Sequence, residues 1–368
     1  MLCCPAVKAR PCPAGVPDFE QRPFILFWEV TRACALACRH CRAEAQPRPH
    51  SEELTPAEAQ KLVGEIAELA PSMLVLTGGD PMLRRDLPEI ISAAAGKGLR
   101  VGLSPAATPL LLRADLAALK SAGVSSLSLS LDGATAASHD RFRGVPHTFE
   151  RTLAAARAAK QAGLMLQVNT TLSRSTLAEF PAFTELMRNE VQPDVWSIFV
   201  LVPTGRAQAS DLPEAAELES VWQQLLALRN ELPFAVKTTE GHHYRRVLLQ
   251  AAKAGGEPPR HLIPTRDGKG VLFISHTGEV QPSGFLPITL GNVRQDKLTE
   301  LYRNHPTMKR LRDDDALGGK CGRCEYRHVC GGSRARAYGV TGDMLAAEPL
   351  CNYIPAALRA APTTPPAP

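Results

Sequence analysis

The sequence has few aromatic residues and no long apolar run. Aromatic side chains make up 5% of its 368 residues, and no stretch approaches the roughly 18 consecutive apolar residues of a membrane-spanning helix. The N-terminal residues also lack the apolar segment of a secretory signal. We therefore expect a cytoplasmic protein with no membrane span.

Charge is not concentrated in any one segment either. The formal net charge is +5, with Arg and Lys scattered among Asp and Glu. A nucleic-acid-binding surface usually combines a basic stripe with stacking aromatic residues, so we expect no nucleic-acid partner. The mild basic excess suits an anionic small substrate and a solvated surface equally well.

Cysteine, in contrast, occurs ten times, and seven of these residues lie in two tight groups. A reducing compartment disfavours disulfides, so the groups indicate metal or redox chemistry. The other three cysteines, Cys3, Cys4 and Cys12, lie in a Pro-containing leader and receive no role.

Strand-like and helix-like segments alternate between residues 23 and 203. Short apolar runs are separated by stretches with helical spacing, which predicts parallel strands joined by right-handed crossovers, in a barrel or an open doubly wound sheet. Ligands of such folds collect at the carboxyl ends of the strands. The predicted strands are 23–30, 73–78, 99–104, 124–131, 164–171 and 195–202, and the predicted helices include 55–70, 84–98, 111–123, 148–163 and 217–232.

This pattern divides the chain into four segments. Residues 1–22 form an irregular leader and residues 23–235 a core of alternating strands and helices. Residues 236–355 form a linker and a smaller region with the second cysteine group, in which 270–285 is expected to be a hairpin. Residues 356–368 are a disordered Pro-rich tail.

The first cysteine group is "RACALACRHC", which follows the first predicted strand. Cys34, Cys38 and Cys41 have three residues in the first gap and two in the second. A closed structural zinc site takes four ligands, whereas three thiolates on an iron–sulfur cluster leave one iron open for a substrate. The alternative is a zinc or redox-inert cysteine group, with "GGDP" at the end of the second strand as an ordinary turn.

These two motifs at successive strand ends, with His40 before the last cysteine, resemble the radical S-adenosylmethionine (SAM) superfamily. The resemblance implies an α/β fold with a partial (β/α)6 TIM-type barrel. It implies that Cys34, Cys38 and Cys41 hold a [4Fe–4S] cluster whose fourth iron chelates SAM. Asp80 stands where the superfamily usually has glutamate. The SAM-binding residues implied by the resemblance are Gly78, Gly79, Asp80, Ser104, Ser130, Arg143 and Asn169.

The second group contains Cys321, Cys324, Cys330 and Cys351, four thiolates that suit either zinc or a fully ligated iron–sulfur cluster. It resembles the C-terminal extension called SPASM or, when shortened, twitch, which implies an auxiliary [4Fe–4S] cluster. Relatives commonly have two further cysteines where this chain has Ser283 and Ser333. Two clusters in total are therefore expected, one of them auxiliary.

The resemblance implies reductive cleavage of SAM to a 5′-deoxyadenosyl radical, which abstracts hydrogen from the substrate. No catalytic side chain is assigned beyond the cluster, and Asp132 and His139 are given no role. The electron donor is expected to be a flavodoxin or a ferredoxin. The auxiliary cluster would accept the electron of an oxidative reaction such as decarboxylation.

The substrate implied is a tetrapyrrole, because the motifs look most like members of the branch that make haem or haem d1. The carboxylates of a tetrapyrrole suit arginine partners. Each arginine among the candidates below can equally be a surface or salt-bridge residue. The alternatives are maturation of a ribosomally made peptide and, from another class, a non-catalytic zinc-binding adaptor. The candidate substrate residues are His242, His243, Tyr244, Arg245, Arg246, Arg334 and Arg336.

Overall fold

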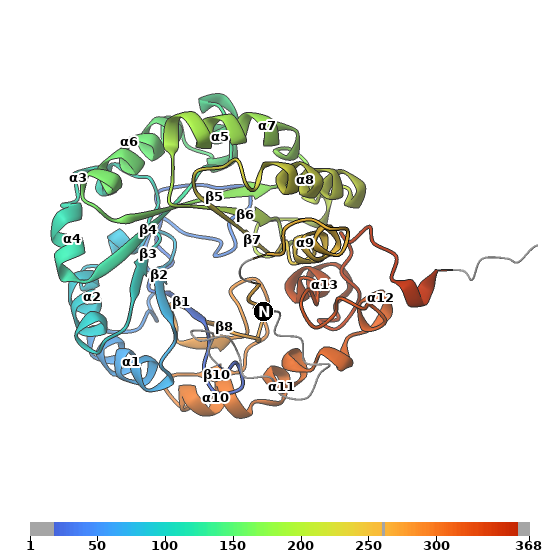
Figure 1. The fold of residues 1–368 in the computed structure, drawn as a ribbon. Helices are drawn as coiled ribbons and strands as arrows, with labels where there is room; N and C mark the ends of the chain where they lie inside the picture. The colour runs from blue at the N-terminus through green and yellow to red at the C-terminus, as the bar shows by residue number, and fades with distance from the viewer. Residues whose placement is uncertain (1–17, 260–261, 360–368) are drawn as a thin grey trace, which may run out of the picture.

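The computed structural model describes residues 18–259 and 262–359. Within them one ten-stranded sheet curves around a central space, and helices surround it (Figure 1). The strand order is β10-β9-β8-β1-β2-β3-β4-β5-β6-β7, and the pairs from β8 through β1 to β7 are all parallel. The strands are β1 (Ile25–Glu29), β2 (Met73–Thr77), β3 (Val101–Leu103), β4 (Val124–Ser130), β5 (Met165–Leu172), β6 (Val195–Val200), β7 (Ala235–Thr239), β8 (Val271–Ile274), β9 (Glu279–Gln281) and β10 (Gly291–Asn292).

The partial barrel expected from the sequence is confirmed, and alternation along each strand explains it. In β1, Leu26 and Trp28 are fully buried beneath the helices, whereas Ile25 and Phe27 line a cavity inside the barrel. Successive side chains of a strand point to opposite faces. The barrel therefore has an apolar outer layer and an inner wall that is free to bind a ligand.

The helices that follow the strands form the outer ring. They are α1 (Pro56–Leu69), α2 (Leu87–Gly96), α3 (Pro109–Arg113), α4 (Leu116–Ala122), α5 (Ala136–Arg143), α6 (Thr148–Gln161), α7 (Phe180–Leu186), α8 (Ala215–Leu228) and α9 (Tyr244–Lys253). In α1, the Thr55 side chain accepts from the backbone of Glu58 and completes a capping box, which stabilises a helix start by about 1 kcal/mol.

The single helix predicted over 111–123 is wrong, because α3 ends at Arg113 and α4 begins at Leu116. The Asp115 side chain accepts a hydrogen bond from the backbone N–H of Ala118. Such a cap satisfies an N–H that the first turn of a helix leaves unpaired. Asp115 therefore starts a new helix rather than continuing the old one.

The C-terminal part extends the barrel. The expected hairpin is confirmed as β8 and β9, and β8 also pairs in parallel with β1. Since β7 and β8 belong to the same sheet as β1–β6, the sheet continues past the boundary proposed at residue 235. The remaining helices are α10 (Leu298–Asn304), α11 (Pro306–Arg312), α12 (Gly319–Gly322) and α13 (Arg334–Thr341).

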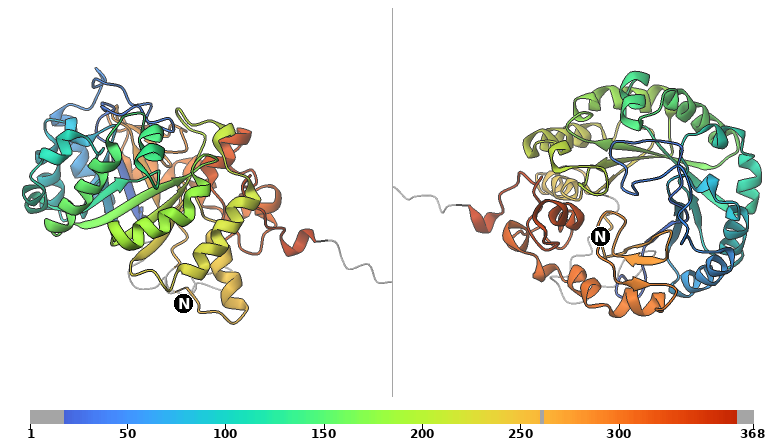
Figure 2. Two further views of the ribbon diagram at one scale, coloured as in Figure 1. Left: turned by 90° about the horizontal axis from the view of Figure 1, so that it is seen from above. Right: turned by 180° about the vertical axis from the view of Figure 1, so that it is seen from behind.

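Seen from behind, the blue segment that follows β1 lies across the opening of the ring (Figure 2). The loops after the other strands meet it at this end, as expected for parallel strands. None of the helices in the described ranges has the length and apolarity to cross a membrane.

Candidate active site

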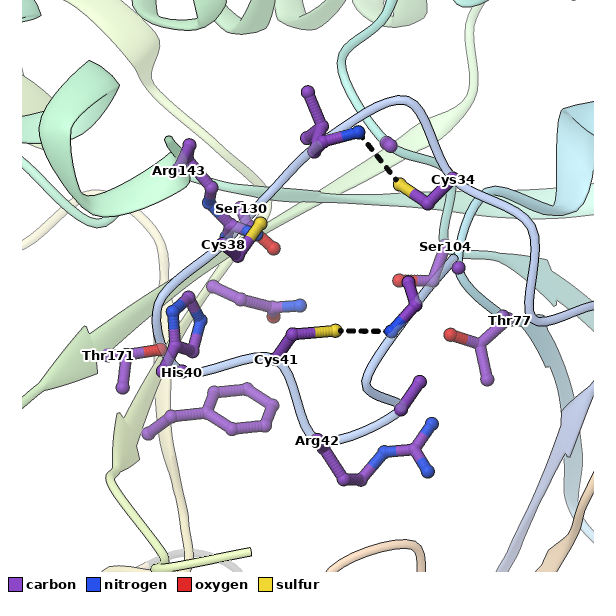
Figure 3. A pocket seen from close by; sticks show the side chains of 18 of the residues that line it. Cys34, Cys38, His40, Cys41, Arg42, Thr77, Ser104, Ser130, Arg143 and Thr171 are labelled. Carbon is purple, nitrogen blue, oxygen red and sulfur yellow. Dashed lines mark hydrogen bonds between the residues drawn. The ribbon is translucent and has the colours of Figure 1, made fainter. Parts of the chain in front are cut away.

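The loop after β1 carries the first three cysteines into a cavity at the carboxyl ends of the strands. The loop folds back on itself, because the backbone N–H of Cys34 donates to the carbonyl of Gln46 at 2.8 Å. The Arg206 guanidinium also donates to the Cys38 carbonyl at 3.2 Å. Figure 3 shows Cys34, Cys38 and Cys41 along this loop, facing a shared space.

Each of the three sulfur atoms has an N–H neighbour. The backbone of Leu36 donates to Cys34 Sγ at 3.3 Å and that of Ala45 to Cys41 Sγ at 3.4 Å. Burial, together with the charges of Asp80, Cys38 and Cys41, raises the pKa of Cys34 to about 11. Buried thiolates close to one another need a cation to compensate them.

Three thiols on one cavity wall fit an iron–sulfur cluster. Thiolates are the usual protein ligands of a [4Fe–4S] cluster, and three of them leave one iron open. The residues therefore suit a cluster because all three ligands are sulfur and all three line the same cavity.

The "GGDP" stretch joins the end of β2 to the cysteine loop. Gly79 donates to the Thr31 carbonyl at 2.8 Å and Asp80 to the Ala33 carbonyl at 2.7 Å. A Cβ on Gly78 or Gly79 would lie 2.5 Å from the Thr31 carbonyl oxygen or 2.3 Å from that of Ala33. Only glycine allows this approach, and both glycines line the cavity.

Asp80 is not among the residues that line this cavity, although Gly78 and Gly79 next to it are. Its carboxylate accepts from the Thr108 hydroxyl at 3.0 Å and from the Met82 backbone at 3.2 Å. It is buried, and burial raises its pKa. In this structure Asp80 ties the β2 loop to the β3 loop.

The other predicted SAM-binding residues come together on the cavity wall: Ser104, Ser130, Arg143 and Asn169. Arg143 donates to the carboxylate of Asp132 and lies 3.6 Å from Cys38 Sγ. Asp132 is fully buried and also accepts from the Thr171 backbone at 2.7 Å. Although burial alone would raise the pKa of Asp132, the charges of Arg143 and His40 hold it below its usual value.

No signal in the sequence marked the role of Asp132, because "DG" after a strand is also a common turn. The sequence likewise did not point to the cavity-lining side chains at the ends of β2, β5 and β6. Threonine and phenylalanine are common in strands, so nothing marked them as site residues. These side chains are Thr77, Thr171 and Phe199, with Phe285 opposite them.

A second cavity continues the first into the barrel. The two cavities share the wall residues Arg42, Thr77, Ser104, Asn169, Phe199 and Phe285. Ile25, Phe27 and Phe273 make one side of it apolar, and charged side chains make the other polar. A large, partly apolar ligand in this space would reach the cysteine loop.

The candidate substrate residues separate into four places. His242 and Arg245 line the second cavity, whereas His243 and Arg246 line the cavity of the second cysteine group. Tyr244 is buried with its ring 5.4 Å from that of Trp222.

Arg334 and Arg336 are fully buried and line neither of these spaces. Arg334 donates to the carbonyls of Ala346 at 2.7 Å and Met344 at 3.2 Å, and Arg336 donates to that of Glu240 at 2.7 Å. The structure therefore places both in the framework around the second cysteine group rather than in a substrate cavity.

The second cysteine group lines one smaller cavity, formed in part by Cys321, Cys324, Cys330 and Cys351. Burial raises the pKa of Cys324 to about 11 and that of Cys330 to about 12, and the neighbouring cysteines add to both shifts. The Glu348 backbone donates to Cys321 Sγ at 3.3 Å. Four thiols that line one cavity again fit a cationic metal cluster.

Ser283 and Ser333 belong to a buried polar network. Ser283 donates to Asp267, and Ser333 donates to Glu240. Burial and the nearby Asp267 raise the pKa of Glu240 to about 8. At the two positions where relatives commonly have cysteine, this chain therefore has serine hydroxyl groups that are hydrogen-bonded to carboxyl groups.

Comparisons with known proteins agree with this geometry. Residues 28–187 match the radical SAM superfamily, and residues 266–325 match the iron–sulfur cluster-binding domain SPASM. The chain belongs to the radical SAM superfamily, in the branch with a C-terminal SPASM domain. It is accordingly a radical SAM enzyme that uses SAM and [4Fe–4S] clusters.

Three individual relatives show which members of the superfamily the chain resembles. The chain is 42% identical to the AdoMet-dependent heme synthase of Oleidesulfovibrio alaskensis, over 90% of this chain and 87% of that protein. It is 29% identical to the pre-heme d1 synthase of Dinoroseobacter shibae, over 95% and 90%. The PqqA peptide cyclase of Rhizobium meliloti is 28% identical, over 95% and 91%.

A solved structure shows the same fold. SuiB of Streptococcus suis, bound to S-adenosylmethionine, superposes with a TM-score of 0.67 at 14% identity, covering 90% of this chain and 78% of that one. At this identity the likeness concerns the fold alone.

Proposed function

We propose that the protein oxidatively decarboxylates carboxylate side chains of an iron porphyrin in haem synthesis. The observation that carries the proposal is the 42% identity to an AdoMet-dependent heme synthase over nine-tenths of this chain. The second cavity supports it, since it combines an apolar side with cationic residues and opens onto the cysteine loop.

In this proposal Cys34, Cys38 and Cys41 hold the first cluster. Gly78 and Gly79 present backbone groups to SAM, and Ser104, Ser130, Arg143 and Asn169 contact its polar groups. When bound, the reduced cluster and SAM supply a radical that takes one hydrogen atom from a propionate side chain, which then loses carbon dioxide and one electron to become a vinyl group. The barrel wall orients the side chain and excludes water.

Cys321, Cys324, Cys330 and Cys351 hold an auxiliary [4Fe–4S] cluster that takes up the released electron. The match to the SPASM domain supports iron rather than zinc at this site. Arg245 lies between this group and the substrate cavity, because it lines the cavity and donates to the Val329 carbonyl at 3.2 Å. A flavodoxin or ferredoxin in the cytoplasm supplies the first electron.

Mass spectrometry of the product tests the proposal. The anaerobically reconstituted protein, given SAM, a reductant and iron-coproporphyrin III, is expected to form haem. A parallel reaction contains a ribosomally made precursor peptide, because a peptide cyclase is among the more distant relatives. A modified peptide with an unchanged porphyrin would replace the proposal with peptide maturation.

A further inference from the structure

Lys237 lies on the inner wall of the barrel in the same row as two proposed SAM-binding residues. The register of the parallel sheet pairs Ser130 with Asn169, Asn169 with Ser197, and Ser197 with Lys237. Paired residues of neighbouring strands point to the same face, and strands lie about 4.8 Å apart. The Lys237 backbone is therefore roughly 10 Å from that of Asn169, and its side chain lines the second cavity.

The Lys237 ammonium has no partner of its own. Among the described residues it takes part in no hydrogen bond, ion pair or ring contact. The side chain is exposed, yet the surrounding protein lowers its pKa to about 8. The ammonium therefore extends along the wall of the second cavity, reached by solvent and without a protein partner among the described residues.

The other cations on this wall are already bound. Arg42 pairs with the buried Glu29 at 2.7 Å, and Arg266 pairs with Asp314. Arg245 donates to the carbonyls of Thr265 at 2.8 Å and Val329 at 3.2 Å. Lys237 is therefore the cavity cation with a free charge.

The acidic groups of the cavity do not pair with Lys237, because each already accepts hydrogen bonds from other groups. Asp267 accepts from Ser283 and from the backbone of Arg334 at 3.0 Å and Ala335 at 2.9 Å. Glu240 accepts from Ser333. A carboxylate brought in by a ligand would supply the missing partner of Lys237.

We infer that Lys237 binds a carboxylate of the substrate and thereby sets which side chain faces the SAM site. The inference rests on the proposed function, since a porphyrin with several carboxylates is the substrate considered. A strand residue holds such an anchor at a fixed distance from Ser130 and Asn169 along the same row. The alternative is that Lys237 is solvated inside the open barrel and binds no ligand.

The test is a titration of iron-coproporphyrin III into the reconstituted protein, followed by the porphyrin absorbance band. Lys237→Met, which keeps the length and removes the charge, is expected to raise the Kd about tenfold or more. Lys237→Arg should recover most of the affinity. Lys61→Ala is the control, because Lys61 is an exposed residue of α1 paired with Glu65 at 3.8 Å.

A methyl-esterified porphyrin provides the second arm. If Lys237 binds a carboxylate, the wild type and Lys237→Met should bind the ester equally weakly. Equal binding of the free acid by both proteins, with equal iron content, would overturn the inference and leave the proposed function standing. A wild type that binds no porphyrin would instead overturn the proposed function, and the assignment of Lys237 with it.

Discussion

The sulfur atoms of Cys34, Cys38 and Cys41 lie 3.3, 3.6 and 3.4 Å from nitrogen donors. Donors at this distance stabilise sulfur ligands and tune the clusters they bind. Three thiolates leave one iron open, whereas the second group offers four. The two groups are therefore suited to different tasks.

Replacing Cys34 with alanine should abolish SAM cleavage, because a ligand of the cluster that binds SAM is lost. The expected result is 5′-deoxyadenosine at the level of a protein-free control, measured by liquid chromatography. Normal cleavage by this variant would show that Cys34 is not a ligand.

Replacing Cys324 with alanine should have a different effect. SAM cleavage should continue, uncoupled from product, because only the acceptor for the released electron is damaged. The ratio of 5′-deoxyadenosine to product should rise about tenfold or more compared with the wild type. A ratio equal to that of the wild type would argue against an auxiliary role for the second group.

Asp132→Asn tests the buried pair next to Cys38. Removing the carboxylate charge leaves the half-buried Arg143 unpaired, which should destabilise the protein by about 3 kcal/mol and weaken SAM binding. Denaturant unfolding and a SAM titration measure the two effects. Asp115→Asn is the control, since asparagine also caps helices; an effect as small as that of the control would contradict the role of Asp132.

At the scale of elements, the strands and helices of the core were predictable because their apolar periodicity is strong. Two features were not. The first is the break between α3 and α4, which depends on one aspartate cap. The second is β7, whose sequence "AVKTT" is short and mostly polar, so that only its pairing with β6 defines it as a strand.

The hairpin of β8 and β9 depends on its turn. Gly278 has φ +86°, and a Cβ there would lie 2.9 Å from Asn292 Oδ1. Gly278→Ala should therefore cost about 2 kcal/mol of unfolding free energy. The matched control is Gly64→Ala in the middle of α1, where nothing lies within 4 Å of the added Cβ and helix propensity predicts a gain of about 1 kcal/mol. Equal effects in thermal unfolding would contradict the turn assignment.

At the scale of the molecule, the sequence predicted that the strand-end loops meet. It did not predict the strand pairing and the cavity walls that connect them. Both cysteine groups and the strand-end motifs were visible as local patterns. The parallel pairing of β8 with β1 brings residues about 250 positions apart into contact, and no local pattern encodes it. For the same reason the sequence did not separate Arg245, on the cavity wall, from Arg334 and Arg336, in the buried framework.

In the proposed function, a hydrogen atom passes directly from the substrate side chain to the 5′-deoxyadenosyl radical, which thereby becomes 5′-deoxyadenosine. Iron-coproporphyrin III deuterated on its propionate side chains tests this in one turnover experiment. The account predicts 5′-deoxyadenosine that carries one deuterium, together with haem. Unlabelled 5′-deoxyadenosine beside an unchanged porphyrin would contradict it.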